Sequence, residues 1–466
     1  MLKHKGGIFW ILILCILFVL FFLIGIYDLD PDFGWHYQMG KYLQLHKSVP
    51  LNDPFSYTMP SFSFISHEWL TDLIISTSYD HMGIVGLAAI FAAIPIIAII
   101  LSSPLKTLPW LILPTIFSAE LLLPRGGIRP QEITWLMIAI LLFLLRNKGI
   151  WNTWRWGLPL LFCLWANLHG GFALGITLLF ITIALNALEN KRLEIGDFLV
   201  WLLSLLAISI NPYGWRIWLE VWRSISDSNL RFTIYEWQPF FALVEIPLFF
   251  LAILGGVLWW SFRKNIAWWE IGIFILFFLA ALSSIRHAAL FAIVALPFVS
   301  NLILMFISSI KKTQLTKRRI FIFFIILYVI AAVSGVITYF QSFRGGFIPP
   351  TNAVIFLKNH PFHGNLLANY NWGGYLIWKY PEKKVFVDGR MPSWRWNLWP
   401  ENEDAPKNES SWAYKEYLNI LQKKQYNEAF KKYNITRIML RRDQVPVKKG
   451  WRKIYQDQEV VILEKE

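Results

Sequence analysis

Long apolar runs separated by short polar segments fill the chain up to residue 340. The first run, Ile8 to Ile26, holds about 19 residues, and a helix of that length spans the ~30 Å hydrocarbon core of a bilayer. The pattern predicts about 11 transmembrane helices, several short enough to be tilted or re-entrant. They are Ile8 to Ile26, Gly83 to Ser103, Leu108 to Leu123, Pro130 to Leu145, Gly157 to Leu168, Phe172 to Leu188, Phe198 to Ile210, Ile246 to Phe262, Trp268 to Ser283, His287 to Ile307 and Ile320 to Phe340.

Basic residues at the ends of these runs predict how the chain is oriented. Lys3 and Lys5 precede the first run, which lacks a small-residue cleavage site, so we expect an uncleaved helix with a cytoplasmic N-terminus. From that start, the basic loops at 146–155 and 263–264 fall inside, as the positive-inside rule requires. An odd number of crossings then places residues 341–466 outside. The chain is expected to be a multi-pass protein of the cell membrane.

After residue 340 the pattern changes to short alternating segments. Strands are expected at Gly364 to Tyr370, Lys384 to Asp388, Ile435 to Arg441 and Glu459 to Leu463, with an amphipathic helix at Trp412 to Tyr433. The predicted fold is therefore an all-α membrane domain, residues 1–340, followed by a small extracytoplasmic α/β domain, residues 341–466. The first outer loop, residues 27–82, is expected to contain interfacial helices.

Composition agrees with this membrane assignment. Hydrophobic residues make up 56% of the chain and charged residues only 16%, whereas charged residues make up about a quarter of soluble globular proteins. A disordered chain is excluded as well. The net charge of +14 suits contact with anionic lipid, and we find no nucleic-acid signature. Both cysteines lie in apolar runs, so no disulfide framework is expected.

The first outer loop opens with the sequence YDLDPDFG, which places Asp30 and Asp32 where the chain leaves the bilayer. The periodicity from Trp35 to Gln44 predicts an interfacial helix directly afterwards. A carboxylate at the mouth of a membrane cavity can act as a general base, because partial desolvation raises its pKa toward the working pH. The alternative is that Asp32 only caps the helix, a role worth about 1 kcal/mol.

A second short helix is expected over the sequence HEWLTDLIISTSY. Its residues Leu70, Leu73, Ile74 and Thr77 should face apolar surroundings, while Glu68 and Asp72 share the other face.

The sequence leaves open a divalent metal ion bound by Asp30, Asp32 and Glu68, and it points to no other cofactor. An EF-hand is rejected, because its sixth and twelfth positions would be Phe33 and Met39 instead of Gly and Glu.

Eight short motifs spread over nearly the whole chain. They are DPDFGWH at 30–36, PLNDPFSYT at 50–58, HEWL at 67–70, RPQ at 129–131, LWANLHGG at 164–171, NPYG at 211–214, EWQP at 236–239 and VDGR at 387–390. With these motifs the chain resembles the GT-C class of membrane glycosyltransferases, which includes protein mannosyltransferases and lipid A aminoarabinose transferases, and it looks like a bacterial branch of that class. It lacks an adjacent Asp-Glu pair in the first loop, because Pro31 separates Asp30 from Asp32, so the identity of the base stays open.

The resemblance implies transfer of a sugar from a polyprenyl-phosphate carrier to a glycan, lipid or protein acceptor on the outer face. A single displacement would invert the anomeric carbon, with Asp30 or Asp32 activating the acceptor. The residues expected to bind substrate are His36, Glu68, Arg129, His169, Glu236 and Arg286.

Arg129 and Arg286 are the candidates for holding the carrier phosphate, because arginine binds phosphate bidentately. Each of these residues also has a structural alternative. The two arginines could instead pair with Asp30, Asp32, Glu68 or Glu132. His169 could be a packing residue, and Trp237 beside Glu236 could anchor the interface. Asp388 and Arg390 are expected to form a structural ion pair.

Two other functions stay open. A transporter or flippase of lipid-linked sugar should show repeat-related halves with broken helices near the midplane, and it should place polar groups on both faces. Neither feature is clear in the sequence. A catalytically silent GT-C-like assembly partner would keep the fold without turning over donor.

Overall fold

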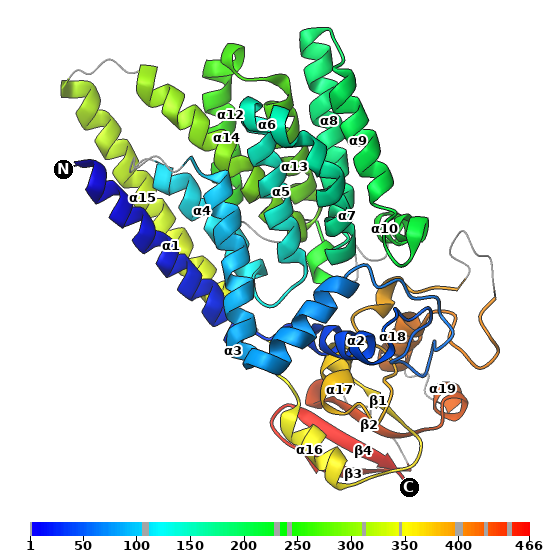
Figure 1. The fold of residues 1–466 in the computed structure, drawn as a ribbon. Helices are drawn as coiled ribbons and strands as arrows, with labels where there is room; N and C mark the ends of the chain where they lie inside the picture. Colours follow the sequence, from blue (N-terminus) through cyan, green and yellow to red (C-terminus); the bar gives the residue numbers. More distant parts are fainter. Residues whose placement is uncertain are drawn as a thin grey trace. The chain divides into compact units, whose positions relative to one another are not determined.

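The computed structural model describes residues 2–104, 111–227, 234–239, 245–309, 314–343, 347–396, 404–423, 427–444 and 450–466. They form two compact units that are interleaved along the chain (Figure 1). We call the segments 1–29, 82–215 and 228–346 the membrane unit, and the segments 30–81, 216–227 and 347–466 the tail unit. The first outer loop therefore folds together with the tail. The predicted boundary at residue 340 assumes two consecutive domains, so it does not describe this interleaving.

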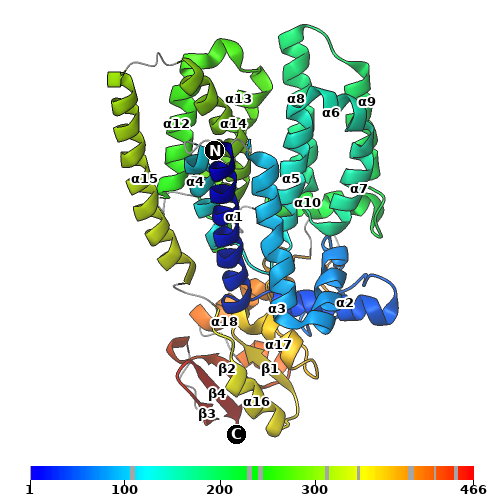
Figure 2. The ribbon, with the colours of Figure 1, turned by 60° about the vertical axis from the view of Figure 1, so that its left-hand side comes forward.

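The membrane unit is a bundle of helices (Figure 2). Helix α14 is almost wholly buried and packs against α4, α12 and α13, while α7 packs against α9 and α8 against α13. The helices are α1 (Leu2–Tyr27), α3 (Trp69–Ser102, shared with the tail unit), α4 (Ile112–Leu122), α5 (Gln131–Arg146), α6 (Lys148–Trp154), α7 (Leu158–Leu168), α8 (Phe172–Asn190), α9 (Ile195–Ala207), α12 (Ile246–Phe262), α13 (Trp268–Ser283), α14 (Ala288–Ser309) and α15 (Gln314–Phe343). Short 3₁₀ turns include η2 (Leu123–Arg125), η5 (Tyr235–Trp237) and η8 (Ile285–His287).

Within the described residues, 5 helices are long and apolar enough to cross a membrane: α1, α3, α8, α12 and α14 with their flanking turns. Helix α5 and the segment Lys148–Leu168 form a further pair, bent by 110°. Shorter apolar helices cover Ile195–Ala207, Trp268–Ser283 and Ile325–Thr338. The chain is thus a multi-pass membrane protein. The expected count of 11 spans is not confirmed, because several predicted spans are short or belong to the bent pair, and the orientation stays a prediction.

The tail unit is built on a four-stranded sheet of order β1-β2-β4-β3 (Figure 1). Strands β1 and β2 are parallel, and the other neighbours are antiparallel. The strands are β1 (Asn365–Ala368), β2 (Ile435–Arg441), β3 (Trp451–Gln456) and β4 (Val460–Lys465). The helices are α2 (Phe33–His46), the start of α3, α10 (Ile217–Ser226), α16 (Thr351–Asn359), α17 (Gly373–Lys379), α18 (Ala413–Lys423) and α19 (Asn427–Lys432).

Side chains alternate along the strands and make a separate core on each face of the sheet. Leu366 packs with α16 and α17, and the next residue, Leu367, packs with α18 and α19. Helix α2 contributes to both cores, through Trp35 on the first face and Met39 on the second. The first outer loop is therefore part of the hydrophobic core of the tail, so its carboxylates are held on a packed scaffold.

The strand prediction is correct for β1, β2 and β4. The expected strand at Lys384 to Asp388 is wrong, because this segment makes only an isolated bridge between Ser56 and Val385. Strand β3 was not expected. The helix predicted from Trp412 to Tyr433 is described as α18 and α19, and residues 424–426 between them lie outside the described residues.

Candidate catalytic site

Asp32 is the N-cap residue of α2, but its side chain makes no capping hydrogen bond. Its backbone carbonyl accepts the first helical hydrogen bonds, from the N–H of Trp35 at 3.2 Å and of His36 at 3.3 Å. The N–H of Asp32 in turn donates to Oδ1 of Asp30, over 2.7 Å. The alternative that Asp32 serves only as a cap is therefore wrong, since its carboxyl group satisfies no helix N–H.

The carboxyl group of Asp32 lies in an acidic and largely desolvated place. Burial, followed by the negative charge of Asp30, raises the pKa of Asp32 to about 7. Asp388 of the tail raises this pKa further, and the positive charge of His36 lowers it. The Asp32 side chain is still only half-buried, so reactants can reach it. A carboxylate that titrates near neutral pH has the proton affinity that a general base needs.

His36 is buried between carboxylates. Its Nδ1 lies 2.6 Å from Oδ1 of Asp72, and its Nε2 lies 3.8 Å from Oε2 of Glu68. Burial lowers the pKa of His36, but Asp72, Glu68 and Asp32 outweigh that effect and raise it to about 9. His36 is therefore an imidazolium cation at neutral pH. Its contacts are with the carboxylates around it, and its expected role in binding substrate stays a prediction.

Glu68 and Asp72 complete a group that we call the carboxylate cluster: Asp30, Asp32, His36, Glu68 and Asp72. Asp72 is fully buried and also accepts a hydrogen bond from Ser66 Oγ, over 3.1 Å, while Glu68 lies 3.4 Å from Nε2 of His67. On the other face of this helix, Leu73 packs against the core of the tail, whereas Ile74 is 39% exposed. Asp72 of α3 and Glu68 just before α3 both approach the imidazole of His36 on α2, which offsets the cost of burying their charges.

A metal ion finds no ready site here. Among the described residues, no group of three or more His, Cys, Asp or Glu side chains is arranged to hold one. Glu68, which the sequence offered as a third ligand beside Asp30 and Asp32, instead faces the two imidazoles of His36 and His67.

The tail contributes the expected ion pair, and the first loop joins it. Arg390 binds Asp388 through two hydrogen bonds of 2.8 and 2.6 Å and also contacts Asp53, over 2.9 Å. All three side chains are buried. The Arg390 guanidinium lies within 5.0 to 5.8 Å of four aromatic rings, those of Trp35, Phe55, Phe64 and Trp394. Arg390 therefore neutralises two carboxylates that are far apart in the sequence.

The predicted cations of the membrane unit form a second group, which we call the arginine cluster: Arg125, Arg129, Glu236, Glu245 and Arg286. Arg129 donates to Oε1 of Glu236 over 3.0 Å, and Arg125 pairs with Glu245 over 2.5 Å. The Arg286 guanidinium lies 4.6 Å from the ring centroid of Trp237. Ser284 Oγ donates to the carbonyl of Glu236 over 3.0 Å, which joins η8 to η5. Arg129, Glu236 and Arg286 are therefore gathered around the two turns η5 and η8.

His169 has packing contacts. Its Nδ1 lies 2.7 Å from Oγ1 of Thr134 and accepts the N–H of Gly171 over 3.0 Å. A Cβ on Gly171 would lie 2.1 Å from the same Thr134 hydroxyl, so this glycine permits close approach of a helix. This packing against Thr134 is enough to explain why residue 171 is a glycine, without a ligand close to its backbone. His169 belongs to the membrane unit, whereas Asp30, Asp32, His36 and Glu68 belong to the tail unit, so a chamber shared by both groups stays a prediction.

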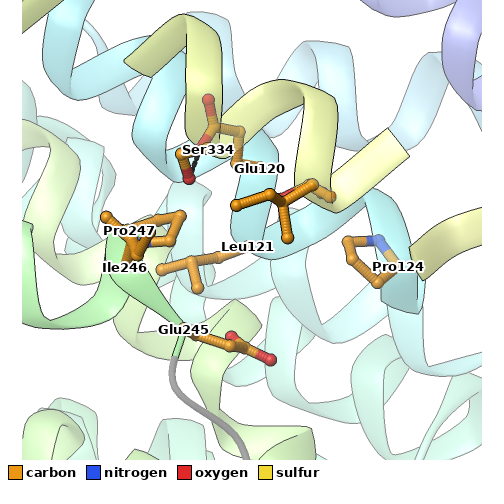
Figure 3. A pocket seen from close by; sticks show the side chains of 9 residues that line it. Glu120, Leu121, Pro124, Glu245, Ile246, Pro247 and Ser334 are labelled. Atoms are coloured by element: carbon orange, nitrogen blue, oxygen red, sulfur yellow. Dashed lines mark hydrogen bonds between the residues drawn. The ribbon is translucent and has the colours of Figure 1, made fainter. Parts of the chain in front are cut away.

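A cavity of about 50 Å³ lies within the membrane unit, between α4, α12 and α15 (Figure 3). Glu120 and Ser334 line it, and Ser334 Oγ donates to Oε2 of Glu120 over 2.6 Å. The other oxygen of Glu120 has no hydrogen-bond partner among the described residues. None of the site residues expected from the sequence lines this cavity.

The chain is similar to ArnT from Cupriavidus metallidurans. The crystal structure of that protein, bound to undecaprenyl phosphate, aligns over 97% of each chain with 11% sequence identity and a TM-score of 0.49. A scan against protein-family models and a search of curated proteins found no match. The residue roles proposed below therefore rest on the geometry of this chain.

Sequence reasoning missed two members of the site. Asp72 was assigned only to a helix face, although its four-residue spacing from Glu68 is the signal that both carboxylates meet one partner. Asp53 lies in the PLNDPFSYT motif, where Asp-Pro signals a turn. Nothing local to that motif reveals that Asp53 pairs with Arg390, because the partners are more than 300 residues apart.

Proposed function

We propose that this protein is a membrane glycosyltransferase in which Asp32 is the general base. The observation that supports this role is the half-buried Asp32 carboxyl group, whose pKa is raised to about 7 and which satisfies no helix N–H. Its neighbour Asp30 holds the Asp32 backbone and adds the negative charge that raises the pKa. We therefore assign base catalysis to Asp32 and a positioning role to Asp30.

The reaction is a single displacement. Asp32 takes the proton of an acceptor hydroxyl or amine as that atom attacks the anomeric carbon of the donor sugar. The bond from the anomeric carbon to the carrier phosphate breaks, and the phosphate leaves with the electron pair. Configuration at the anomeric carbon is inverted, and the lipid phosphate stays in the bilayer. The donor class, a sugar on polyprenyl phosphate, follows from the resemblance of the motifs.

The arginine cluster is proposed to meet the carrier phosphate. Arg129 is paired with Glu236, a glutamate that is itself 42% exposed at its side chain, so the pair is open to exchange for a doubly charged phosphate. Within the described residues, the Arg286 guanidinium contacts the ring of Trp237, a weaker partner than a carboxylate. Both arginines are thus suited to bind an anion.

The test follows transfer in D30N and D32N variants. Glycoconjugates of cells expressing each variant are compared by mass spectrometry, and the purified proteins are offered a panel of polyprenyl-phosphate-linked sugars while free polyprenyl phosphate is measured. We expect D32N to lose about 10²- to 10⁴-fold in turnover, the usual contribution of a general base. The matched control is D80N, because Asp80 lies in the same loop but pairs with Lys41 over 2.8 Å at the surface.

Full turnover by D32N would overturn the base assignment. Absence of donor turnover by the wild-type protein would instead favour the silent partner, and movement of intact donor across vesicles would favour the transporter.

A further inference from the structure

We propose that the VDGR turn and the glycine pair of the tail form a seat that positions the carboxyl group of Asp32, an inference that rests on the proposed function. The seat consists of Gly373 and Gly374 at the start of α17 and of Asp388, Gly389 and Arg390. Gly374 and Gly389 approach Pro31 and Asp32 closely, and Gly373 packs against Val387 and Asp388. None of the five residues contributes a group to the reacting atoms. They are therefore positioning residues.

The contacts between the seat and the first loop are closer than any side chain would allow. A Cβ on Gly389 would lie 1.9 Å from Oδ1 of Asp32. A Cβ on Gly374 would lie 2.2 Å from the carbonyl oxygen of Pro31, and one on Gly34 would lie 2.0 Å from the carbonyl oxygen of Gly374. Three glycines thus bring the DPDFG backbone, and the Asp32 carboxyl group, directly onto the tail.

The buried ion triad of Asp53, Asp388 and Arg390 holds the seat in place. Arg390 joins Asp388 of the turn to Asp53 of the first loop. Asp53 also accepts the N–H groups of Phe55 at 3.1 Å and Ser56 at 2.8 Å. A charge buried among aromatic rings stays in place only when its partners are fixed too, so the triad holds the turn rigidly.

Backbone pairing continues this link along the PLNDPFSYT motif. The N–H of Val385 donates to the carbonyl of Phe55 over 3.0 Å, and the N–H of Tyr57 returns a bond to Val385 over 3.1 Å. The hydroxyl of Thr58 donates to the carbonyl of Phe386 over 2.6 Å. The PLNDPFSYT and VDGR motifs therefore form one structure, whose function is to place the base.

The first test is G389A. Its new methyl group must displace the Asp32 carboxyl group, and a displacement of about 1 Å lowers turnover about 10²-fold. The control is G256A, because a Cβ at Gly256 of α12 meets nothing within 4 Å. We expect G256A to retain wild-type turnover. A folded G389A protein with full turnover would overturn the seat.

The second test changes the charge of the seat with a side chain of nearly the same size. D388N removes a negative charge that raises the pKa of Asp32, so the Asp32 titration should move to lower pH. The titration is followed without substrate, as the infrared carboxyl band that is present in the wild type and missing from D32N. This second variant decides the matter if G389A does not fold.

The two proposals fail in different ways. An unchanged infrared midpoint in D388N would overturn the seat even if D32N is inactive. A fully active D32N would overturn the base, while the infrared midpoint would still report whether the seat holds this carboxyl group.

Discussion

The carboxylate cluster and the arginine cluster use the same kinds of side chains but balance their charges differently. In the tail unit, His36 and Arg390 are each bound by two carboxylates, and Asp32 is left with a raised pKa. In the membrane unit, Arg125 and Arg129 each contact a glutamate, and Arg286 contacts a tryptophan ring. Neighbouring carboxylates raise the pKa of Asp32, whereas the partly exposed pair of Arg129 and Glu236 can exchange partners. The proposed function assigns base catalysis to the first cluster and phosphate binding to the second.

The largest expected effect contrasts the buried arginine of the tail with an open one of the membrane unit. R390M leaves Asp53 and Asp388 buried without their cation, so the free energy of unfolding should fall by about 3–5 kcal/mol. R129M breaks a partly exposed pair and should lower it by only about 0.2–1 kcal/mol. Denaturant titration in detergent, followed by circular dichroism, measures both. Equal losses would remove the distinction between the clusters.

The next prediction concerns what Arg129 binds. If it holds the carrier phosphate, R129Q should weaken binding of a polyprenyl phosphate about tenfold, which corresponds to ~1.4 kcal/mol. E236Q removes the negative charge that Arg129 contacts at this position, so it should leave binding unchanged or strengthen it. Tryptophan fluorescence titration of the purified variants gives both affinities. If R129Q and E236Q weaken binding equally, the pair is structural and the phosphate assignment is wrong.

The sequence predicted the helix of the first loop better than it predicted the connections of that loop. The position of Asp32 before an interfacial helix was readable, because α2 has a regular apolar face from Trp35 onward. The link from Asp53 to Arg390 was not, because it joins two turns that only the tertiary fold brings together. For the same reason Lys384 to Asp388 was taken for a strand. Its hydrogen bonds go to the first loop instead of the sheet.

The membrane unit shows the complementary difficulty. Apolar runs revealed most of its helices, but a run does not tell whether its helix spans the bilayer alone. The sequence predicts two independent spans before and after Asn147. In the structure, the helices on either side of Asn147 form a pair bent by 110°. Strand β3 escaped prediction because Trp451–Gln456 is mostly polar and has no fully buried residue. Periodicity thus fails where an element is short, bent or at the edge of a sheet.

A smaller effect is expected from His36, which tunes Asp32 across the cluster. The charge of His36 lowers the pKa of Asp32, so H36Q should raise this pKa. Since the base must be deprotonated, the wild-type turnover should fall as the pH drops through about 7, and in H36Q this fall should begin at higher pH. Turnover measured from pH 5 to 9 gives both midpoints. A glutamine can still donate to Asp72, and an unchanged midpoint would show that the His36 charge does not reach the base.

The smallest effect tests the cavity of the membrane unit, which lies in neither cluster. S334A removes the hydroxyl that donates to Glu120 and should lower the free energy of unfolding by about 0.6 kcal/mol, the average for hydrogen bonds between membrane helices. The double variant E120L/S334A removes both polar partners, so it should regain most of this loss. Denaturant titration of the three proteins measures the recovery, and turnover should stay at the wild-type level in each. A loss of turnover in E120L/S334A would show that this cavity takes part in the reaction, and the division of work between the two clusters would then have to include it.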